Sequence, residues 1–322
     1  MTRPKIPVVI VVFSLLLVFS TWGWGQEFPK RPIRMIIPYS AGGGTDILGR
    51  AFQGPLEKEL KVKILMENIP AGSSKVGTLE VMKAKPDGYT LVLMPSQAWV
   101  PYYYNKSLEM KVWEKLTPIA DLTSEPYGFI EVLADSPYKT WADLVKAAQA
   151  NPGKLTCGGA AAGGIMEILL MEVSKPAGIQ CRYVPFAGAG QSKVALLGGH
   201  IDFRICQPTE SIAMIRAGKT RGLAVSTEKR FGPLPDVPTF KELGIGEAMI
   251  MTRGIWGPPN MRSQEVQILS RAIENATKDR DFVKLVEDEL VYKVDFKPGP
   301  AMQREIIDFD RTLGPKFEAM LK

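Results

Sequence analysis

Residues 38–46 read Pro-Tyr-Ser-Ala-Gly-Gly-Gly-Thr-Asp, and the interpretation of the whole chain starts from this stretch. It follows a short apolar run, 33–37, that is typical of a buried strand, and it precedes a segment, 46–60, with the pattern of a helix. A helix that begins after three glycines presents free backbone N–H groups at its positive end. Those donors suit an anion, and glycine lets a ligand approach the main chain. Thr45 or Asp46 could cap the helix.

The glycines do not belong to either common phosphate-binding motif. The stretch contains neither G-x-x-x-x-G-K-[ST] nor G-x-G-x-x-G, so a carboxylate is a better prediction than a nucleotide. The alternative is that the glycines serve only a tight strand-to-helix turn and bind nothing.

The N-terminus, residues 1–25, differs from the rest of the chain. Arg3 and Lys5 are followed by an apolar run, 8–19, and then by small residues that include Gly25. This is the pattern of a cleavable secretory signal peptide. The run is shorter than the roughly 20 residues that a membrane-spanning helix needs, so an uncleaved anchor is the less favoured alternative. We therefore expect an exported, periplasmic protein.

Composition and charge exclude several function classes. The 322 residues are 45% hydrophobic and 23% charged, with a formal net charge of +6, which is ordinary for a soluble globular protein. The positive charge is dispersed, without basic runs or interleaved aromatic residues, so nucleic acid is not expected as a partner. The single histidine, His200, argues against a Cys/His metal site. No cofactor and no metal are predicted.

Three cysteines, Cys157, Cys181 and Cys206, lie in or beside strand-like apolar runs. An exported chain permits disulfides, but an odd number of cysteines leaves at least one thiol unpaired within a monomer. Three buried free thiols are the favoured prediction, and one disulfide is the alternative.

From residue 28 onward, short apolar runs alternate with longer amphipathic segments. This alternation predicts an α/β protein with parallel strands and crossover helices. Ligands of such sheets bind beyond the carboxyl ends of the strands, so loops 39–46 and 95–98 should share one rim. A second loop, 158–164, repeats the order of apolar strand, small residues and helix start. Two such loops in separate halves could face each other across a cleft.

Two further features permit both a functional and a structural interpretation. Arg204 interrupts an apolar strand and could attract a carboxylate, but pairing with a buried acid such as Glu131 is favoured because a buried charge is rarely left unpaired. Residues 99–104, Trp-Val-Pro-Tyr-Tyr-Tyr, could form a wall for a flat ligand, although a packing cluster is favoured.

Four stretches, in their order along the chain, resemble one family. They are 28–46, which begins Phe-Pro-Lys-Arg-Pro-Ile-Arg; 85–91, Lys-Pro-Asp-Gly-Tyr-Thr-Leu; 184–202, which ends Leu-Leu-Gly-Gly-His-Ile-Asp; and 223–239, which ends Leu-Pro-Asp-Val-Pro-Thr. Together they are specific, and the similarity covers residues 28 to about 320. The chain resembles the extracytoplasmic solute receptors of tripartite tricarboxylate transporters, the Bug family.

The resemblance implies a two-lobed fold of the type II periplasmic binding proteins, in which each lobe is a mostly parallel sheet flanked by helices. The first lobe would hold residues 26–124 and 250–322, and the second lobe residues 125–249. It implies capture of a small carboxylate in the cleft between the lobes and its delivery to membrane transporter subunits. Such a receptor has no catalytic residues, and we expect a monomer.

Ligand contacts carried over from the family lie in both lobes. In the first lobe they are Tyr39, Ala41, Gly42, Gly43, Thr45, Asp46 and Ser96; in the second they are Ala161, Gly163, Gly164, Phe186, Gly188 and Ala189. We add Gln207, and also Glu167, which stands where the family has a histidine. An acid at 167 that pointed into the cleft would repel a second carboxylate and favour an amine or amide.

Two other functions remain as alternatives. The same fold could present its ligand to a signalling protein instead of a transporter. An exported hydrolase would need a base within reach of a nucleophile, and His200 is expected away from the cleft rim. Asp46 and Glu167 could in principle form a glycosidase pair, but nothing else in the sequence supports that chemistry. An enzyme is therefore the least favoured reading.

Overall fold

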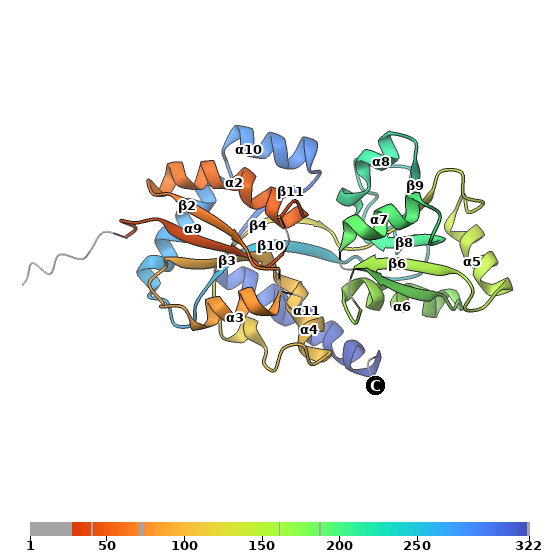
Figure 1. Ribbon diagram of the computed structural model, residues 1–322, viewed down its shortest axis with the longest axis horizontal. Coiled ribbons are helices and arrows are strands. Elements are labelled where there is room, and N and C mark those ends of the chain that lie inside the picture. Colours follow the sequence, from red (N-terminus) through yellow and green to blue (C-terminus); the bar gives the residue numbers. More distant parts are fainter. Residues whose placement is uncertain (1–27, 40, 71–73, 161, 187, 321–322) are drawn as a thin grey trace, which may run out of the picture.

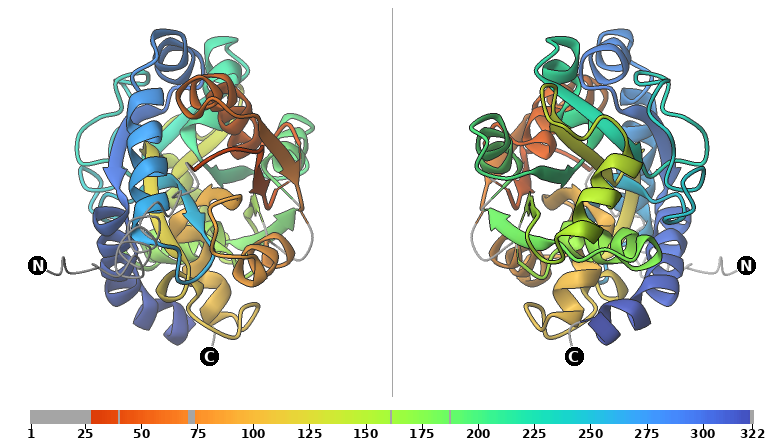
Figure 2. Two further views of the ribbon diagram at one scale, coloured as in Figure 1. Left: turned by 90° about the vertical axis from the view of Figure 1, so that its left-hand side faces the viewer. Right: turned by 90° about the vertical axis from the view of Figure 1, so that its right-hand side faces the viewer.

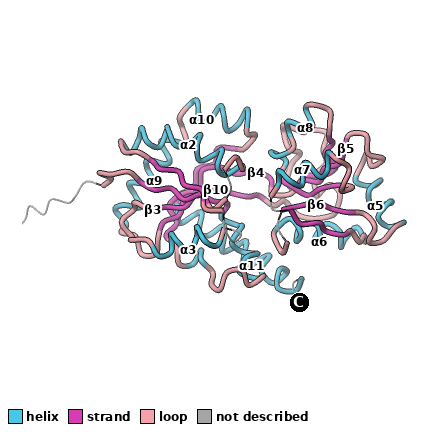
Figure 3. The backbone as a smooth tube through the Cα atoms, viewed as in Figure 1, coloured by secondary structure: helices cyan, strands magenta, loops and turns pink. Residues whose placement is uncertain are grey.

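Two sheets organise the protein, as the computed structural model shows for residues 28–39, 41–70, 74–160, 162–186 and 188–320. The strand order is β11-β4-β10-β3-β1-β2 in one sheet and β7-β6-β8-β5-β9 in the other. Helices flank both sheets, and the two sheets form separate lobes along the long axis (Figure 1, Figure 3). The predicted two-lobed α/β fold is confirmed.

The first lobe, defined by the six-stranded sheet, is built from two separate parts of the chain. Its strands are β1 (Ile33–Ile37), β2 (Ile64–Asn68), β3 (Thr90–Pro95), β4 (Thr117–Pro126), β10 (Ile250–Gly257) and β11 (Lys293–Pro298). Its helices are α2 (Gly44–Leu60), α3 (Lys75–Lys83), α4 (Trp99–Tyr104), α9 (Ser263–Ala276), α10 (Arg280–Lys284) and α11 (Gly299–Met320).

The second lobe, defined by the five-stranded sheet, comes from the middle of the chain. Its strands are β5 (Phe129–Leu133), β6 (Thr156–Ala160), β7 (Arg182–Phe186), β8 (Phe203–Cys206) and β9 (Thr220–Val225). Its helices are α5 (Trp141–Ala150), α6 (Ile165–Ala177), α7 (Ala189–Leu197) and α8 (Ile212–Arg216).

Strand direction places the two glycine-rich loops. In the first lobe β1 runs parallel to β2 and β3, and in the second lobe β6 runs parallel to β7 and β8. The carboxyl ends of these parallel strands therefore share one edge in each lobe, as expected. The remaining pairs are antiparallel, so each sheet is mixed rather than mostly parallel. The antiparallel strands include β4 and β10, along which the chain passes between the lobes.

These two connecting strands lie side by side at the centre of the molecule (Figure 1). β4 is separated from β5 by residues 127–128 alone, and β10 pairs with β4 with Met251 opposite Glu125. The predicted lobe boundaries, 124/125 and 249/250, fall at this pair and remain a prediction. The last helix, α11, lies along one flank of the molecule, outside the sheets (Figure 2).

Each lobe has its own apolar core, and the spacing of its residues explains the secondary structure. Leu48, Phe52, Leu56 and Leu60 recur every fourth residue along α2 and are all buried. This spacing puts them on one helix face, against the buried side chains of β1. In the second lobe, Phe203 and other strand residues pack in the same way against α5 and α6.

Residues 99–104 form the helix α4, and the packing interpretation of this aromatic stretch fits the structure. Trp99 is fully buried, its indole N–H donates to Thr78 Oγ1 at 3.1 Å, and its ring meets Trp256 edge-on at 5.1 Å. The strands β4 and β11 were not predicted. Many of the ten residues of β4 are polar or small, and the apolar alternation of β11 is limited to Val294 and Phe296.

Arg204 and Glu131 form a fully buried ion pair inside the second lobe, so the structural interpretation of Arg204 is confirmed. The guanidinium also donates to Ser211 Oγ at 2.8 Å and to the Ala189 carbonyl at 3.2 Å. It thereby connects the strand to the starts of α7 and α8.

The three cysteines are free, as favoured. Cys157 and Cys206 are buried, whereas Cys181 is only half-buried, so burial was predicted correctly for two of them. Burial raises the pKa of the Cys181 thiol to about 11. Within the residues described above, no helix has the length and apolar character needed to cross a membrane. The predicted signal peptide, residues 1–25, lies outside the described residues.

Candidate ligand-binding site

The first glycine-rich loop joins the carboxyl end of β1 to the start of α2. The helix begins at Gly44, its N-cap residue is Gly43, and no side chain caps it. The prediction that Thr45 or Asp46 caps the helix is wrong, because both residues lie inside the first turn. Gly42 has a φ of +77°, a conformation that favours glycine, and a side chain there would contact nothing. No side chain therefore caps the amides at the start of α2, and the space beside Gly42 is open.

Asp46 holds this loop in shape. Its Oδ2 accepts from the Gly42 amide at 2.8 Å and from Arg50 Nε at 3.0 Å, and its Oδ1 accepts from Asn68 Nδ2 at 3.0 Å. Burial raises the pKa of the Asp46 carboxyl, but these three hydrogen bonds outweigh burial and leave the pKa below its usual value. All three donors belong to the first lobe. The Asp46 carboxylate therefore affects a ligand indirectly, because it fixes the shape of the loop.

The second glycine-rich loop, at the carboxyl end of β6, repeats this construction. The helix α6 has Gly164 as its N-cap residue and no capping side chain, and Gly163 has a φ of +65°. Glu167 Oε2 accepts from the Gly163 amide at 2.7 Å. In both lobes an acid in the first helical turn thus binds the amide four residues before it. The repulsion considered for an acid at 167 depends on its pointing into the cleft, whereas Glu167 Oε2 turns back onto its own loop.

Loss of either acid should loosen its loop. We expect Asp46→Ala to lower the free energy of unfolding by about 1–3 kcal/mol, because a buried charged acceptor with three donors is removed. Glu167→Ala should cost less, since that side chain is half-buried and only one such bond is described. Urea denaturation of both variants measures the difference. A loss for Glu167→Ala as large as that for Asp46→Ala would contradict this ranking.

Several described contacts join the two lobes, and three of them are relevant to these loops. Asn105, which follows α4 in the first lobe, donates from Nδ2 to the Gly163 carbonyl at 3.1 Å. Thr209 of the second lobe donates to Glu125 Oε2 on β4 at 2.9 Å. Arg253 on β10 donates from NH2 to Gln207 Oε1 at 3.4 Å. Candidate residues of both lobes are therefore within reach of one another.

Arg253, Glu125 and Asn105 were not predicted as site residues. A signal for Arg253 was present, because a lone charge in the apolar run 250–257 resembles the pattern that drew attention to Arg204. No comparable signal marks Asn105. It reaches Gly163 only because α4 ends at Tyr104, and the sequence did not predict that helix.

The other predicted site residues are distributed as follows. Tyr39 is half-buried against the first-lobe core, Ala41 is exposed, and a side chain at Gly188 would contact nothing. Phe186 packs against the α7 side of the second lobe. Ser96 is buried, and its hydroxyl accepts from the Trp256 indole at 3.1 Å, so this side chain is engaged inside the first lobe. Ala161 lies outside the described residues.

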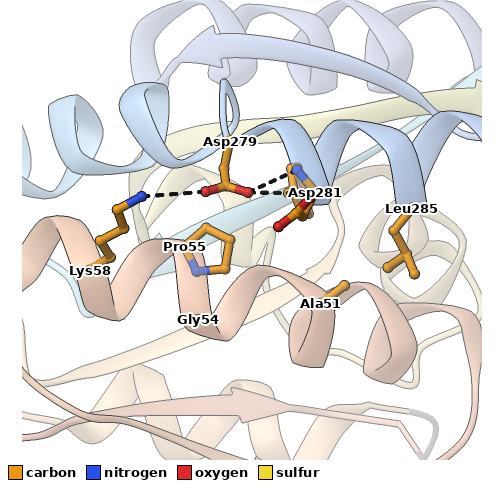
Figure 4. Close-up of a pocket in the computed structure, with 8 residues that line it drawn as sticks. Ala51, Gly54, Pro55, Lys58, Asp279, Asp281 and Leu285 are labelled. Carbon is orange, nitrogen blue, oxygen red and sulfur yellow. Dashed lines mark hydrogen bonds and ion pairs between the residues drawn. The ribbon is translucent and has the colours of Figure 1, made fainter.

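Two surface hollows lie away from the start of α2. The smaller, of about 380 Å³, is on the outer side of the first lobe, between the C-terminal half of α2 and α10 (Figure 4). Of its two carboxylates, Asp279 and Asp281, Asp279 already caps α10 and lies 3.8 Å from Lys58 Nζ. The larger, of about 1010 Å³, follows α6 from Glu167 to Pro176 and reaches the end of α11. Neither is lined by Gly42, Gly43 or Thr45.

Catalytic and metal chemistry find little support in the described part of the chain. His200 is exposed in the turn between α7 and β8, at the opposite edge of the sheet from loop 158–164. Among the described residues, no group of three His, Cys, Asp or Glu side chains could hold a metal ion.

The fold and the paired loops define a two-lobed solute-binding protein, and comparisons with known proteins identify the family. A family model described as "Tripartite tricarboxylate transporter family receptor" matches residues 48–303, and the chain belongs to this family. The "UPF0065 protein in gbd 5'region" of Cupriavidus necator is 34% identical over 300 residues, which span 92% of this chain and 88% of that protein.

Solved structures agree with this assignment. A "TctC solute binding protein from Polaromonas", solved without ligand, is 28% identical with a TM-score of 0.71, covering 91% of this chain and 97% of its own. "MatC" from Rhodopseudomonas palustris "with bound malate" is 23% identical with a TM-score of 0.78, covering 92% and 100%. At that identity the second likeness shows the fold alone.

Proposed function

We propose that this receptor captures a small carboxylate between its two lobes in the periplasm and presents it to membrane transporter subunits. The observation that carries the proposal is the repeated loop: two helix starts, one per lobe, that have no capping side chain. Asp46 and Glu167 bind the amides of Gly42 and Gly163 and do not cap the helices, so no side chain covers the first-turn N–H groups, although each carboxylate offsets part of the helix dipole. Membership of the tripartite tricarboxylate transporter receptor family supports a carboxylate as the ligand class.

The residues that we propose as ligand contacts are the backbone groups and side chains of the two loops and of the strand ends beside them. They are Tyr39, Ala41, Gly42, Gly43, Thr45, Ala161, Gly163, Gly164, Phe186, Gly188, Ala189 and Gln207. Asp46 and Glu167 position the two loops. Ser96 supports the site from inside the first lobe, where its hydroxyl binds the Trp256 indole. Contacts to both lobes would favour a closed state when ligand is bound.

A thermal-shift screen tests the ligand class. Malate, succinate, adipate and benzoate should be compared with their amides and with amino acids. A carboxylate present at about 100 times its Kd adds about 2.7 kcal/mol to the stability of the folded state, which raises Tm by several degrees. A rise in Tm with amides or amines, and none with any acid at millimolar concentration, would contradict the proposal.

A further inference from the structure

Arg253 occupies the centre of the contacts between the lobes. It lies on β10 and is 3% exposed. Its Nε donates to Thr45 Oγ1 at 3.3 Å, its NH1 pairs with the carboxylate of Glu125, and its NH2 donates to Gln207 Oε1 at 3.4 Å. One guanidinium thus touches the first turn of α2, a connecting strand and the second lobe.

The guanidinium also lies directly against the helix start. A Cβ atom built on Gly44 would be 3.2 Å from Arg253 NH2 and 2.6 Å from the Tyr292 hydroxyl. The Tyr292 ring stacks on the guanidinium with its centroid 4.5 Å away, which fixes the plane of the fork. Any side chain at position 44 would fill this space, so glycine keeps Arg253 next to the amides of α2.

Thr45 and Gln207 are proposed ligand contacts from different lobes, and both touch Arg253. A ligand that reaches both must therefore lie beside the guanidinium. An arginine has five N–H donors in a planar fork that matches a carboxylate. Among the described residues, three of those five donors are used, and the contact from NH2 is long.

We propose that Arg253 pairs directly with the carboxylate of the ligand, and that this contact selects an acid over its amide. The inference rests on the proposed function and identifies Arg253 as the positive charge that the ligand carboxylate meets at the same site. Gln207 then contacts the bound carboxylate from the side of the second lobe. Glu125 is the internal carboxylate that balances Arg253 when no ligand is bound, and it competes with the ligand for the fork.

Two opposite changes in affinity follow from this competition. Glu125→Gln removes the internal competitor, so carboxylate affinity should rise. Arg253→Met together with Glu125→Gln removes both charges without leaving either one buried alone, which avoids the main folding penalty. In this double variant carboxylate affinity should fall about 10- to 100-fold, the equivalent of one charge-assisted hydrogen-bonded contact. Affinity for the corresponding amide should change little.

The matched control is a second arginine of the first lobe that also pairs with carboxylates. Arg34 on β1 binds Glu67 and Glu80 far from the start of α2. Arg34→Met with Glu67→Gln therefore removes one guanidinium and one carboxylate, as the test variant does, at a place away from the proposed site. Each protein is titrated by calorimetry with malate, succinate, adipate and benzoate and with their amides. Ligand-free melting curves establish that each variant is folded.

The outcomes separate this inference from the proposed function. Weaker carboxylate binding in the Arg253/Glu125 double variant, with the control unchanged, supports the direct contact. Equal carboxylate binding by the wild type and the double variant overturns the inference and leaves the proposed function standing. Failure of the wild type to bind any of the four acids overturns the proposed function, and the inference with it.

Discussion

Replacing Arg204 by methionine is expected to lower the free energy of unfolding by about 3–5 kcal/mol. Arg204 and Glu131 are both fully buried, so the single variant leaves the Glu131 carboxylate without its counter-ion in the interior of the second lobe. The variant also removes the donor to Ser211 and to the Ala189 carbonyl. Urea denaturation followed by circular dichroism measures the loss.

An exposed ion pair of the same lobe provides the control. Arg230 pairs with Glu242, and their side chains are 49% and 45% exposed, so Arg230→Met should cost no more than about 1 kcal/mol. Arg204→Met combined with Glu131→Leu should recover most of the stability, because no charge is then left unpaired. If the double variant were as unstable as Arg204→Met alone, packing around the guanidinium would matter more than its charge.

The second large effect is a loss of stability as pH rises from about 4 to about 7. Burial raises the pKa of the Asp121 carboxyl from 3.8 to about 7, and Glu305 adds to the rise while Lys297 opposes it. The unfolded chain releases this proton near pH 4, whereas the folded protein holds it until about pH 7. Folding therefore takes up a proton in this window, and Asp121 alone should cost about 4 kcal/mol across it.

Asp121→Asn provides the test, because asparagine keeps the shape of the side chain and cannot titrate. The free energy of unfolding of both proteins is measured from pH 4 to pH 7. The wild type should lose stability relative to the variant as pH rises, and the difference should level off above pH 7. Parallel curves for the two proteins would show that folding does not raise the pKa of Asp121.

Local pattern was sufficient to predict most of the fold. The strand 33–37 has the predicted bounds, and α2 begins two residues before the predicted start at Asp46. Apolar spacing identifies such elements because their own side chains form the core. β4 was missed because its ten residues are polar or small at many positions yet buried by neighbouring β10 and β11. Only tertiary contact explains that strand.

The candidate site shows the same division. The two glycine-rich loops were found from sequence, because a left-handed backbone at Gly42 and Gly163 requires glycine locally. The directions of the Asp46 and Glu167 side chains could not be predicted from sequence. An acid in the first turn of a helix can point either to a ligand or back to its own loop.

The sequence by itself determined the fold class, the family and the two loops, since each depends on residues close together in the chain or on motifs kept in order. Tertiary structure alone decided that Arg253 meets Thr45 and Gln207, which lie far from it in sequence. The physical reason is that the antiparallel pairing of β4 with β10, where the chain passes between the lobes, decides which charged residues become neighbours. No local pattern encodes that pairing, and the proposed selectivity for a carboxylate depends on it.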